Sequence, residues 1–318
     1  MFWITYKTSP IRIDLVQKLP KSLEPTTLAE LSGIRLRARH IVDGYLAGLH
    51  RSPYHGRSIE FTQHREYTTG DDIRHIDWKV FGRTDRFFVK QYEDESNLIC
   101  RILLDTSESM HFKADSSSLS KYEYGQCLAA AWSWLILRQS DAAGAMLFDT
   151  RIHSEIPAHA GSNHFDAILD LIEDPVVNPQ TDLPAVLRAL NNKLTRRNVV
   201  VIISDCFGDI SGLNDQLKML CQHRHDVILL QIMDPVEVNL TLRADVTLNG
   251  LEQTGSRFVP VRHLRKAYCA QVTQFRQALS EMSLKAGASF HAINSDQPLN
   301  QVIQEILMQH AAHAVAKV

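Results

Sequence analysis

Residues 199–205 read VVVIISD, an unbroken run of valine and isoleucine followed by a serine and an aspartate. A strand without polar alternation is typical of the interior of a parallel sheet that is covered on both faces. A similar run, LICRILLD at residues 98–105, also ends in an aspartate, and VILLQIM at residues 227–233 is a third. These runs predict the central strands of a mostly parallel sheet.

Amphipathic segments separate the predicted strands along the chain. We expect helices over residues 122–139, 163–173, 183–194, 212–222 and 262–285, and a last helix from about residue 298. We expect further strands over residues 143–148, 152–156 and 289–293, and a small hairpin over 246–248 and 257–261. Strands that alternate with helices indicate an α/β fold, a doubly wound and mostly parallel sheet with helices on both faces.

The start of the chain lacks this alternation. Residues 1–23 have little pattern and are interpreted as a loosely attached arm. A helix is expected from Thr27, which has the spacing of a capping box with Glu30, to about Gly44 or Gly48.

Short strand-like runs and turns follow over residues 52–97, including an expected strand over residues 86–92. We expect this part to form a small β-rich layer attached to the main sheet. The predicted domains are therefore an N-terminal arm, helix and β-rich segment over residues 1–97 and an α/β domain over residues 98–318.

Composition limits the classes of function. The 318 residues include 34 lysines and arginines and 36 aspartates and glutamates, which gives a formal net charge of −2. This near balance argues against a protein that works by neutralising the phosphates of a nucleic acid. The five cysteines are odd in number and form no CxxC pair, so neither a disulfide framework nor a zinc ribbon is expected.

Hydropathy argues against a membrane protein. The longest apolar run, residues 127–137, covers about half of the ~20 residues that a spanning helix needs. The first residues, MFWITYKTSP, lack the charged and apolar regions of a signal peptide. We expect a cytoplasmic protein without a transmembrane segment.

Polar residues follow two of the predicted central strands. Asp105, Ser107 and Ser109 alternate along the loop after the first, Asp205 ends the second, and Thr181 precedes a predicted helix. In a doubly wound sheet, ligands bind outside the carboxyl ends of the strands. Carboxylates and hydroxyls are hard oxygen ligands that suit Mg²⁺ or Mn²⁺. The alternative, that these residues only cap helices, stays open.

At these residues the chain resembles the metal-ion-dependent adhesion site of von Willebrand factor type A domains. In that family a D-x-S-x-S loop, a separate threonine and a later aspartate hold one Mg²⁺. The matching positions are Asp105, Ser107, Ser109, Thr181 and Asp205.

The segment before the first central strand resembles the domain-of-unknown-function-58 family. The residues that carry this resemblance are Gly56–Phe61, Arg65–Tyr67, Gly70–Trp78 and Lys90–Glu95. The two resemblances together cover roughly residues 30–310. They imply a type A sheet fold and a frequent association with MoxR-type AAA+ ATPases.

The resulting hypothesis is a non-enzymatic, metal-dependent protein-binding module. Mg²⁺ is expected to be held by Ser107, Ser109 and Thr181, with Asp105 and Asp205 bound directly or through water. Such an ion is incompletely neutralised and keeps an open position, which an Asp or Glu of a partner protein can fill.

The resemblance implies that the partner is a MoxR-type ATPase, with this chain as its adaptor, or a client protein that supplies the carboxylate. The loop of residues 111–120 and the turn of residues 207–212 are expected to frame that contact.

The alternative is a Mg²⁺-dependent phosphoester hydrolase that uses Asp105 or Asp205 on a metal-bound water. The sequence counts against it, because neither the D-x-S-x-S loop nor residues 204–208 contain a lysine or arginine to bind phosphate. A glycine-rich phosphate loop is also missing. Cys206 is expected to be a core residue, and the Glu66–Trp78 segment is expected to be structural.

Overall fold

The computed structural model describes most of the α/β region and parts of the N-terminal segment. The described residues are 25–31, 33–49, 64–66, 82, 86–90, 98–161, 163–241, 246–249, 256–259 and 261–316. The expected arm of residues 1–23 and most of the expected β-rich segment lie outside them.

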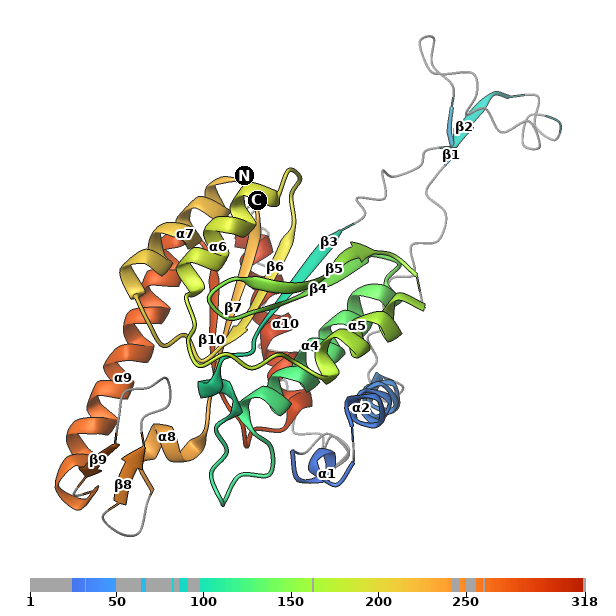
Figure 1. Cartoon of the computed structure of the whole chain (residues 1–318). Coiled ribbons are helices and arrows are strands. Elements are labelled where there is room, and N and C mark those ends of the chain that lie inside the picture. The colour runs from blue at the N-terminus through green and yellow to red at the C-terminus, as the bar shows by residue number, and fades with distance from the viewer. Residues whose placement is uncertain are drawn as a thin grey trace, which may run out of the picture.

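A six-stranded sheet forms the centre of the molecule, with the strand order β10-β7-β6-β3-β4-β5 (Figure 1). Its strands are β3 (Ile99–Asp105), β4 (Ala142–Phe148), β5 (Ile152–His159), β6 (Val199–Ser204), β7 (Asp226–Met233) and β10 (Ser289–Asn294). All neighbouring pairs are parallel except β4 and β5, which form an antiparallel hairpin. The expected strands are therefore confirmed, and β3 and β6 lie side by side in the sheet.

Helices cover both faces of this sheet (Figure 1). On one face lie α4 (Lys121–Arg138), α5 (Asn163–Glu173) and α10 (Leu299–Ala316). On the other lie α6 (Leu183–Lys193), α7 (Ile210–Gln222) and α9 (Val261–Ala286). Successive residues of β6 explain the two layers, because Val201 and Ile203 pack with the first group whereas Val200 and Ile202 pack with the second. The predicted α/β fold with a mostly parallel, doubly wound sheet is confirmed.

The N-terminal helix differs from the prediction. Two helices, α1 (Pro25–Ala29) and α2 (Ile34–Leu49), replace the expected single one. The break lies at Gly33, whose φ of +79° suits glycine and does not continue a helix. Thr27 lies inside α1 and does not cap its start, so the capping-box prediction was wrong.

The N-terminal helices are packed on the α/β core. Leu28, Ile34 and Ile41 are buried in the same apolar cluster as α4. Arg37 fixes the break between the helices, since its Nε donates to the carbonyl oxygens of Leu28 and Leu31 at 3.0 and 3.1 Å. The division of the chain at residue 97 stays a prediction.

Two small hairpins complete the described strands. Strand β1 (His64–Glu66) pairs with β2 (Phe88–Lys90), and β8 (Val246–Asn249) pairs with β9 (Ser256–Val259). The second hairpin was predicted. Of the strand expected over residues 86–92, β2 forms residues 88–90, residues 86 and 87 precede it, and residues 91 and 92 lie outside the described residues. Most of the Glu66–Trp78 segment lies outside the described residues.

Two short elements at the carboxyl edge of the sheet were not predicted. A 3-10 turn, η3 (Glu108–His111), follows β3, and a one-turn helix, α8 (Pro235–Asn239), follows β7. Both bring polar residues to the edge where β3 and β6 end. Among the described residues, no helix has the length and apolar character needed to cross a membrane.

Candidate metal centre

Asp105 is the last residue of β3 and is fully buried. Its Oδ1 accepts the N–H of Ser107 at 2.9 Å, which is the bond of an Asx turn. Its Oδ2 accepts the hydroxyl of Ser204 at 2.6 Å and that of Thr181 at 3.4 Å. The carboxylate is therefore held in one orientation by neutral groups from three segments of the chain.

The other predicted hydroxyls lie beside it. The Oγ atoms of Ser107, which precedes η3, and of Ser109, which lies in η3, are 3.1 Å apart, and both residues are buried. The backbone N–H of Glu108 donates to the carbonyl of Asn178 at 2.9 Å, which joins this turn to the loop that carries Thr181. The structure thus brings Asp105, Ser107, Ser109 and Thr181 together as predicted.

Asp205 lies at the same edge but faces a different partner. It is fully buried, and its Oδ2 accepts from Nζ of Lys121 at 3.0 Å. Its Oδ1 accepts the backbone N–H of Phe207 at 3.2 Å. Its charge acts on Asp105, whose pKa it helps to raise. Of the five predicted ligands, Asp205 is the one whose charge is already paired.

Lys121 was missed by the sequence analysis. It is the first residue of α4, directly after Ser120, whose side chain caps the helix in a capping box with Glu123. A cation at a helix N-terminus is disfavoured by the helix dipole. A lysine at the first position of a predicted helix therefore indicates that its ammonium pairs with an acidic side chain. In the structure its partners are Asp205 and Glu237.

Two more residues were missed because they act by positioning the threonine loop. Asp149 comes directly after β4, beside the end of β3, and its Oδ2 accepts the Nδ2 amide of Asn178 at 3.1 Å. Its carbonyl oxygen accepts the N–H of Asp182 at 3.2 Å. Burial opposes ionisation of Asp149, but the hydrogen bond from Asn178 and others outweigh it and lower the pKa. The aspartate that follows the predicted strand over residues 143–148 was the sequence feature that could have identified Asp149.

The structure also decides the capping alternative for three of these residues. Ser107 precedes η3 but makes no side-chain cap bond. The cap of α6 is Asp182, whose Oδ1 accepts from the N–H of Ala185 at 2.9 Å, rather than Thr181. The cap of α7 is Asp209 rather than Asp205. The hydroxyls of Ser107 and Thr181 are therefore not used as helix caps.

The electrostatics of the cluster favour a cation. Burial, followed by repulsion from Asp205, raises the pKa of Asp105 from 3.8 to about 7, although the hydrogen bonds from Ser204 and Ser107 oppose this shift. Burial lowers the pKa of Lys121, but attraction by Asp205 and Glu237 raises it overall. Within the described part of the chain, Asp105 is therefore a buried carboxylate without a positively charged hydrogen-bond partner.

The donor set matches a hard divalent ion. It consists of one carboxylate and three hydroxyls, and the described part of the chain contains no group of three or more His, Cys, Asp or Glu residues placed to hold a metal. Oxygen donors without imidazole or thiolate suit Mg²⁺ or Mn²⁺ rather than Zn²⁺. The residues present thus fit the predicted ion, while its binding stays a prediction.

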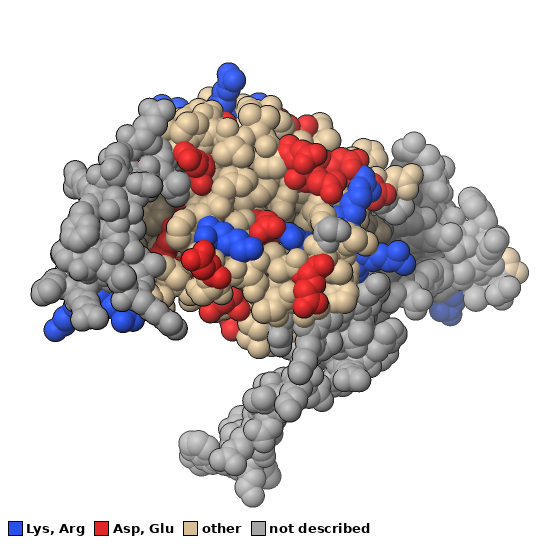
Figure 2. Space-filling model, turned by 60° about the horizontal axis from the view of Figure 1, so that its bottom comes forward, with Lys and Arg blue, Asp and Glu red and all other residues tan. Residues whose placement is uncertain are grey.

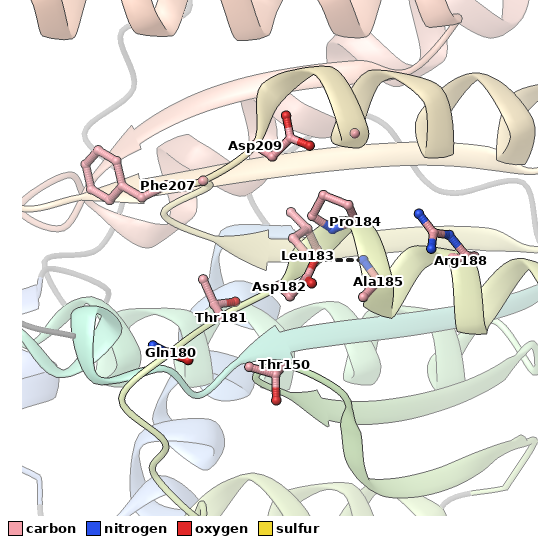
Figure 3. A pocket seen from close by; sticks show the side chains of 12 residues that line it. Thr150, Gln180, Thr181, Asp182, Leu183, Pro184, Ala185, Arg188, Phe207 and Asp209 are labelled. Carbon is pink, nitrogen blue, oxygen red and sulfur yellow. Dashed lines mark hydrogen bonds between the residues drawn. The ribbon is translucent and has the colours of Figure 1, made fainter. Parts of the chain in front are cut away.

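A hollow of about 540 Å³ opens beside Thr181, between the starts of α6 and α7. Figure 3 shows Thr181 and Asp182 along it, with Phe207 at one end and Arg188 at the other. Phe207 is 38% exposed although it follows the buried Asp205 and Cys206. In Figure 2, which brings the lower side of Figure 1 forward, acidic and basic side chains are mixed across the described surface.

Comparison with known families gives one match over most of the chain. The model of the family described as "Protein of unknown function DUF58" matches residues 63–278. An uncharacterized protein of Mycobacterium tuberculosis, Rv1480, is 29% identical over 232 residues, which are 72% of each chain. An uncharacterized protein of Mycobacterium bovis, Mb1516, is similar to the same extent.

Solved structures give more distant similarities. BatB, a conserved hypothetical protein of Bacteroides thetaiotaomicron, is 16% identical with a TM-score of 0.46, and the match covers 68% of this chain and 98% of BatB. The SpRpn10 VWA domain is 12% identical with a TM-score of 0.38, and the match covers 65% of this chain and 94% of that domain.

Proposed function

This chain belongs to the DUF58 family, and from that premise we propose that it is a non-enzymatic interaction module that binds a partner protein through a divalent cation. Its mostly parallel α/β sheet is like that of von Willebrand factor type A domains, and this likeness suggests a protein-interaction module. The finer proposal concerns how the contact is made. Asp105, Ser107, Ser109 and Thr181 would hold Mg²⁺ or Mn²⁺ at the carboxyl edge of the sheet.

One observation carries this proposal. A fully buried carboxylate, Asp105, is hydrogen-bonded to neutral groups alone among the described residues, and it is surrounded by hydroxyls with no assigned capping role. A bound Mg²⁺ would supply the missing positive charge and accept an oxygen ligand from outside the chain. One carboxylate and three hydroxyls leave that ion with a net positive charge, so an Asp or Glu of the partner is the matching ligand.

The side chains around the site have separate tasks in this proposal. Ser204 orients Asp105 through a 2.6 Å hydrogen bond. Asn178 and Asp149 hold the loop that carries Thr181. Phe207, which is exposed at the rim, offers an apolar surface next to the hollow, where the partner's residues around its carboxylate would lie.

The proposed partner is a MoxR-type AAA+ ATPase or one of its client proteins, with this chain as the adaptor. Family resemblance suggests this partner class, and the site chemistry adds that the contacting residue is acidic. The proposed location is the cytoplasm.

The phosphoester hydrolase remains the alternative function. Among the residues that the structure describes, the cation paired with Asp205 is Lys121, which is fully buried and already bound to two carboxylates. It is therefore not placed to hold a substrate phosphate. Burial raises the pKa of the Cys206 thiol well above its ordinary value, with further contributions from Asp205 and Asp105, so this thiol is a poor nucleophile. These observations favour a binding role.

A pull-down with a purified MoxR-type ATPase of the same source tests the proposal. We expect the wild-type chain to retain the ATPase in Mg²⁺ and to release it in EDTA. Asp105→Ala should abolish capture, and Asp166→Ala, which removes a carboxylate with 67% side-chain exposure on α5, should leave it unchanged.

Circular dichroism would first show that each variant is folded. Capture that persists with EDTA or with folded Asp105→Ala would contradict a metal-mediated contact. Turnover of a generic phosphoester that is lost in Asp105→Asn would favour the hydrolase instead.

A further inference from the structure

A buried lysine lies beside the candidate metal centre. The side chain of Lys121 is 0% exposed, and its Nζ is 3.0 Å from Oδ2 of Asp205 and 2.9 Å from Oε1 of Glu237. The ammonium also lies 5.6 Å from the ring centroid of Phe207 and 6.0 Å from that of Phe112. An ammonium in this position is enclosed by two carboxylates and two aromatic rings.

Both acidic partners of Lys121 are fixed by other bonds. Oε2 of Glu237 accepts the N–H of Asp234 at 3.0 Å, as part of the capping box of α8. Oδ1 of Asp205 accepts the N–H of Phe207. The ammonium therefore joins the start of α4 to the segments that follow β6 and β7, and it cannot move toward solvent without separating them.

The two buried aspartates consequently have opposite electrostatic surroundings. The hydrogen-bond partners of Asp105 are neutral, so its charge remains available to a cation. The charge of Asp205 is compensated by an ammonium at 3.0 Å. A second cation on the same carboxylate would be repelled by that ammonium at short range and low dielectric.

We infer that Lys121 is a built-in counter-ion that removes Asp205 from the ligand set of the metal and leaves Asp105 as its only anionic ligand. Lys121 is in this sense a positioning residue that acts through Asp205. The inference rests on the proposed function, and it departs from the expectation that Asp205 binds the ion. Its consequence is that the bound ion keeps a surplus of positive charge for the partner's carboxylate.

Charge-balanced variants test this role. Lys121→Met removes the ammonium at similar side-chain length, Asp205→Asn removes the paired carboxylate, and the double variant removes both. Lys193→Met is the matched control, because it breaks a solvent-accessible ion pair, at 2.9 Å, between Lys193 on α6 and Glu155 on β5.

The first measurement is thermal unfolding in EDTA. We expect Lys121→Met to lower the melting temperature strongly, because it leaves Asp205 and Glu237 buried without a counter-ion. The double variant should melt at a higher temperature than Lys121→Met, and the control should melt close to wild type. A double variant that melts no higher than Lys121→Met would contradict the ion pair.

The second measurement is Mg²⁺ titration by calorimetry. We expect Lys121→Met to bind Mg²⁺ at least about tenfold more tightly than wild type, because Asp205 becomes available as a second anionic ligand. The double variant should stay within about threefold of wild type, because it retains every proposed ligand and the net charge. If the double variant binds Mg²⁺ more than about threefold more weakly than wild type, Asp205 is itself a ligand and the inference is overturned.

Failure of the proposed function gives a different result. If Mg²⁺ does not bind to the wild-type chain and Asp105→Ala changes nothing, the metal site itself is contradicted, and the inference falls with it. If Asp105→Ala abolishes binding but Lys121→Met does not strengthen it, the metal site stands and the role of Lys121 is contradicted.

Discussion

Asp105 combines full burial with neutral hydrogen-bond partners, and this combination makes its charge depend on what binds beside it. Burial and the nearby Asp205 raise its pKa to about 7. A proton and a metal ion therefore compete for the same carboxylate near neutral pH. The effect of Mg²⁺ on the stability of the chain should therefore depend on pH.

The stabilisation by Mg²⁺ should increase with pH. The pKa of Asp105 in the folded, metal-free chain is about 7 and its ordinary value is 3.8. The stability that comes from the protonated group is thus fully present below the ordinary value and is lost as pH rises through 7. We expect the Mg²⁺-induced rise in melting temperature to be larger at about pH 8 than at about pH 5.5.

Differential scanning fluorimetry with and without Mg²⁺ at the two pH values measures this difference. Asp105→Asn should remove it, because an amide neither titrates nor supplies a charged ligand. An equal Mg²⁺ effect at both pH values in the wild-type chain would refute the assignment.

The hydroxyls of Ser107 and Ser109, at the start of the turn η3, should each be needed for metal affinity. Ser107→Ala and Ser109→Ala remove a proposed ligand while leaving the backbone of the turn in place. We expect each to weaken Mg²⁺ binding by about tenfold or more in calorimetric titration. Ser116→Ala, at an exposed serine outside the cluster, should bind as wild type does. Unchanged affinity in both turn variants would rule out the serines as ligands.

At the scale of elements, the site depends on the edges of three strands meeting in the right order. Strand β3 lies between β4 and β6, and their carboxyl ends carry Asp105, Asp149 and Asp205. Regular parallel pairing of β3 with both neighbours keeps these ends level. The hairpin of β4 and β5 then fixes the outer side of the sheet.

At Gly144 in β4, the neighbouring strand β5 leaves no space for a side chain. A Cβ at this position would lie 2.6 Å from the backbone nitrogen of Ala158 and 2.8 Å from the carbonyl oxygen of Ile156. Backbone cannot move aside as a flexible side chain does, so we expect Gly144→Ala to destabilise the chain by about 1–3 kcal/mol in urea unfolding. Gly82→Ala, where no atom of the described residues lies within 4 Å of an added Cβ, is the control. Equal stability of Gly144→Ala and wild type would contradict the described pairing.

Most elements were predictable because each depends on a local pattern. The run of Val199–Ile203 and the similar run before Asp105 indicate buried strands wherever the remaining chain lies. The break at Gly33 and the short helix α8 were missed, because each is stabilised by contacts with distant segments. Arg37 and Glu237 illustrate this, since their partners Glu123 and Lys121 lie on α4.

The candidate site was predictable to the same extent. Asp105, Ser107, Ser109 and Thr181 each lie at a strand end or before a helix start, positions that sequence patterns locate. The pairing of Asp205 with Lys121 requires the start of α4 to meet the segment that follows β6, and no spacing in the sequence encodes this contact. The sequence therefore placed Asp205 at the correct edge but left its charge partner unidentified.

For the whole molecule, the net charge of −2 conceals an uneven distribution. Buried acidic groups gather at one edge of the sheet, where Asp105, Asp149, Asp205 and Asp234 are all nearly inaccessible to solvent. Lys121 compensates part of this charge. In this proposal, a metal ion beside Asp105 would compensate that carboxylate and make this edge a surface that binds an acidic partner.

The central claim is that Asp105, Ser107, Ser109 and Thr181 hold a divalent ion. Crystals grown with Mn²⁺ test it most directly, because the anomalous signal of manganese identifies the ion. We predict a six-coordinate ion about 2.1 Å from the oxygens of Asp105, Ser107, Ser109 and Thr181, with Asp205 still paired with Lys121. A well-ordered cluster at saturating Mn²⁺ without anomalous density beside these residues would contradict the claim.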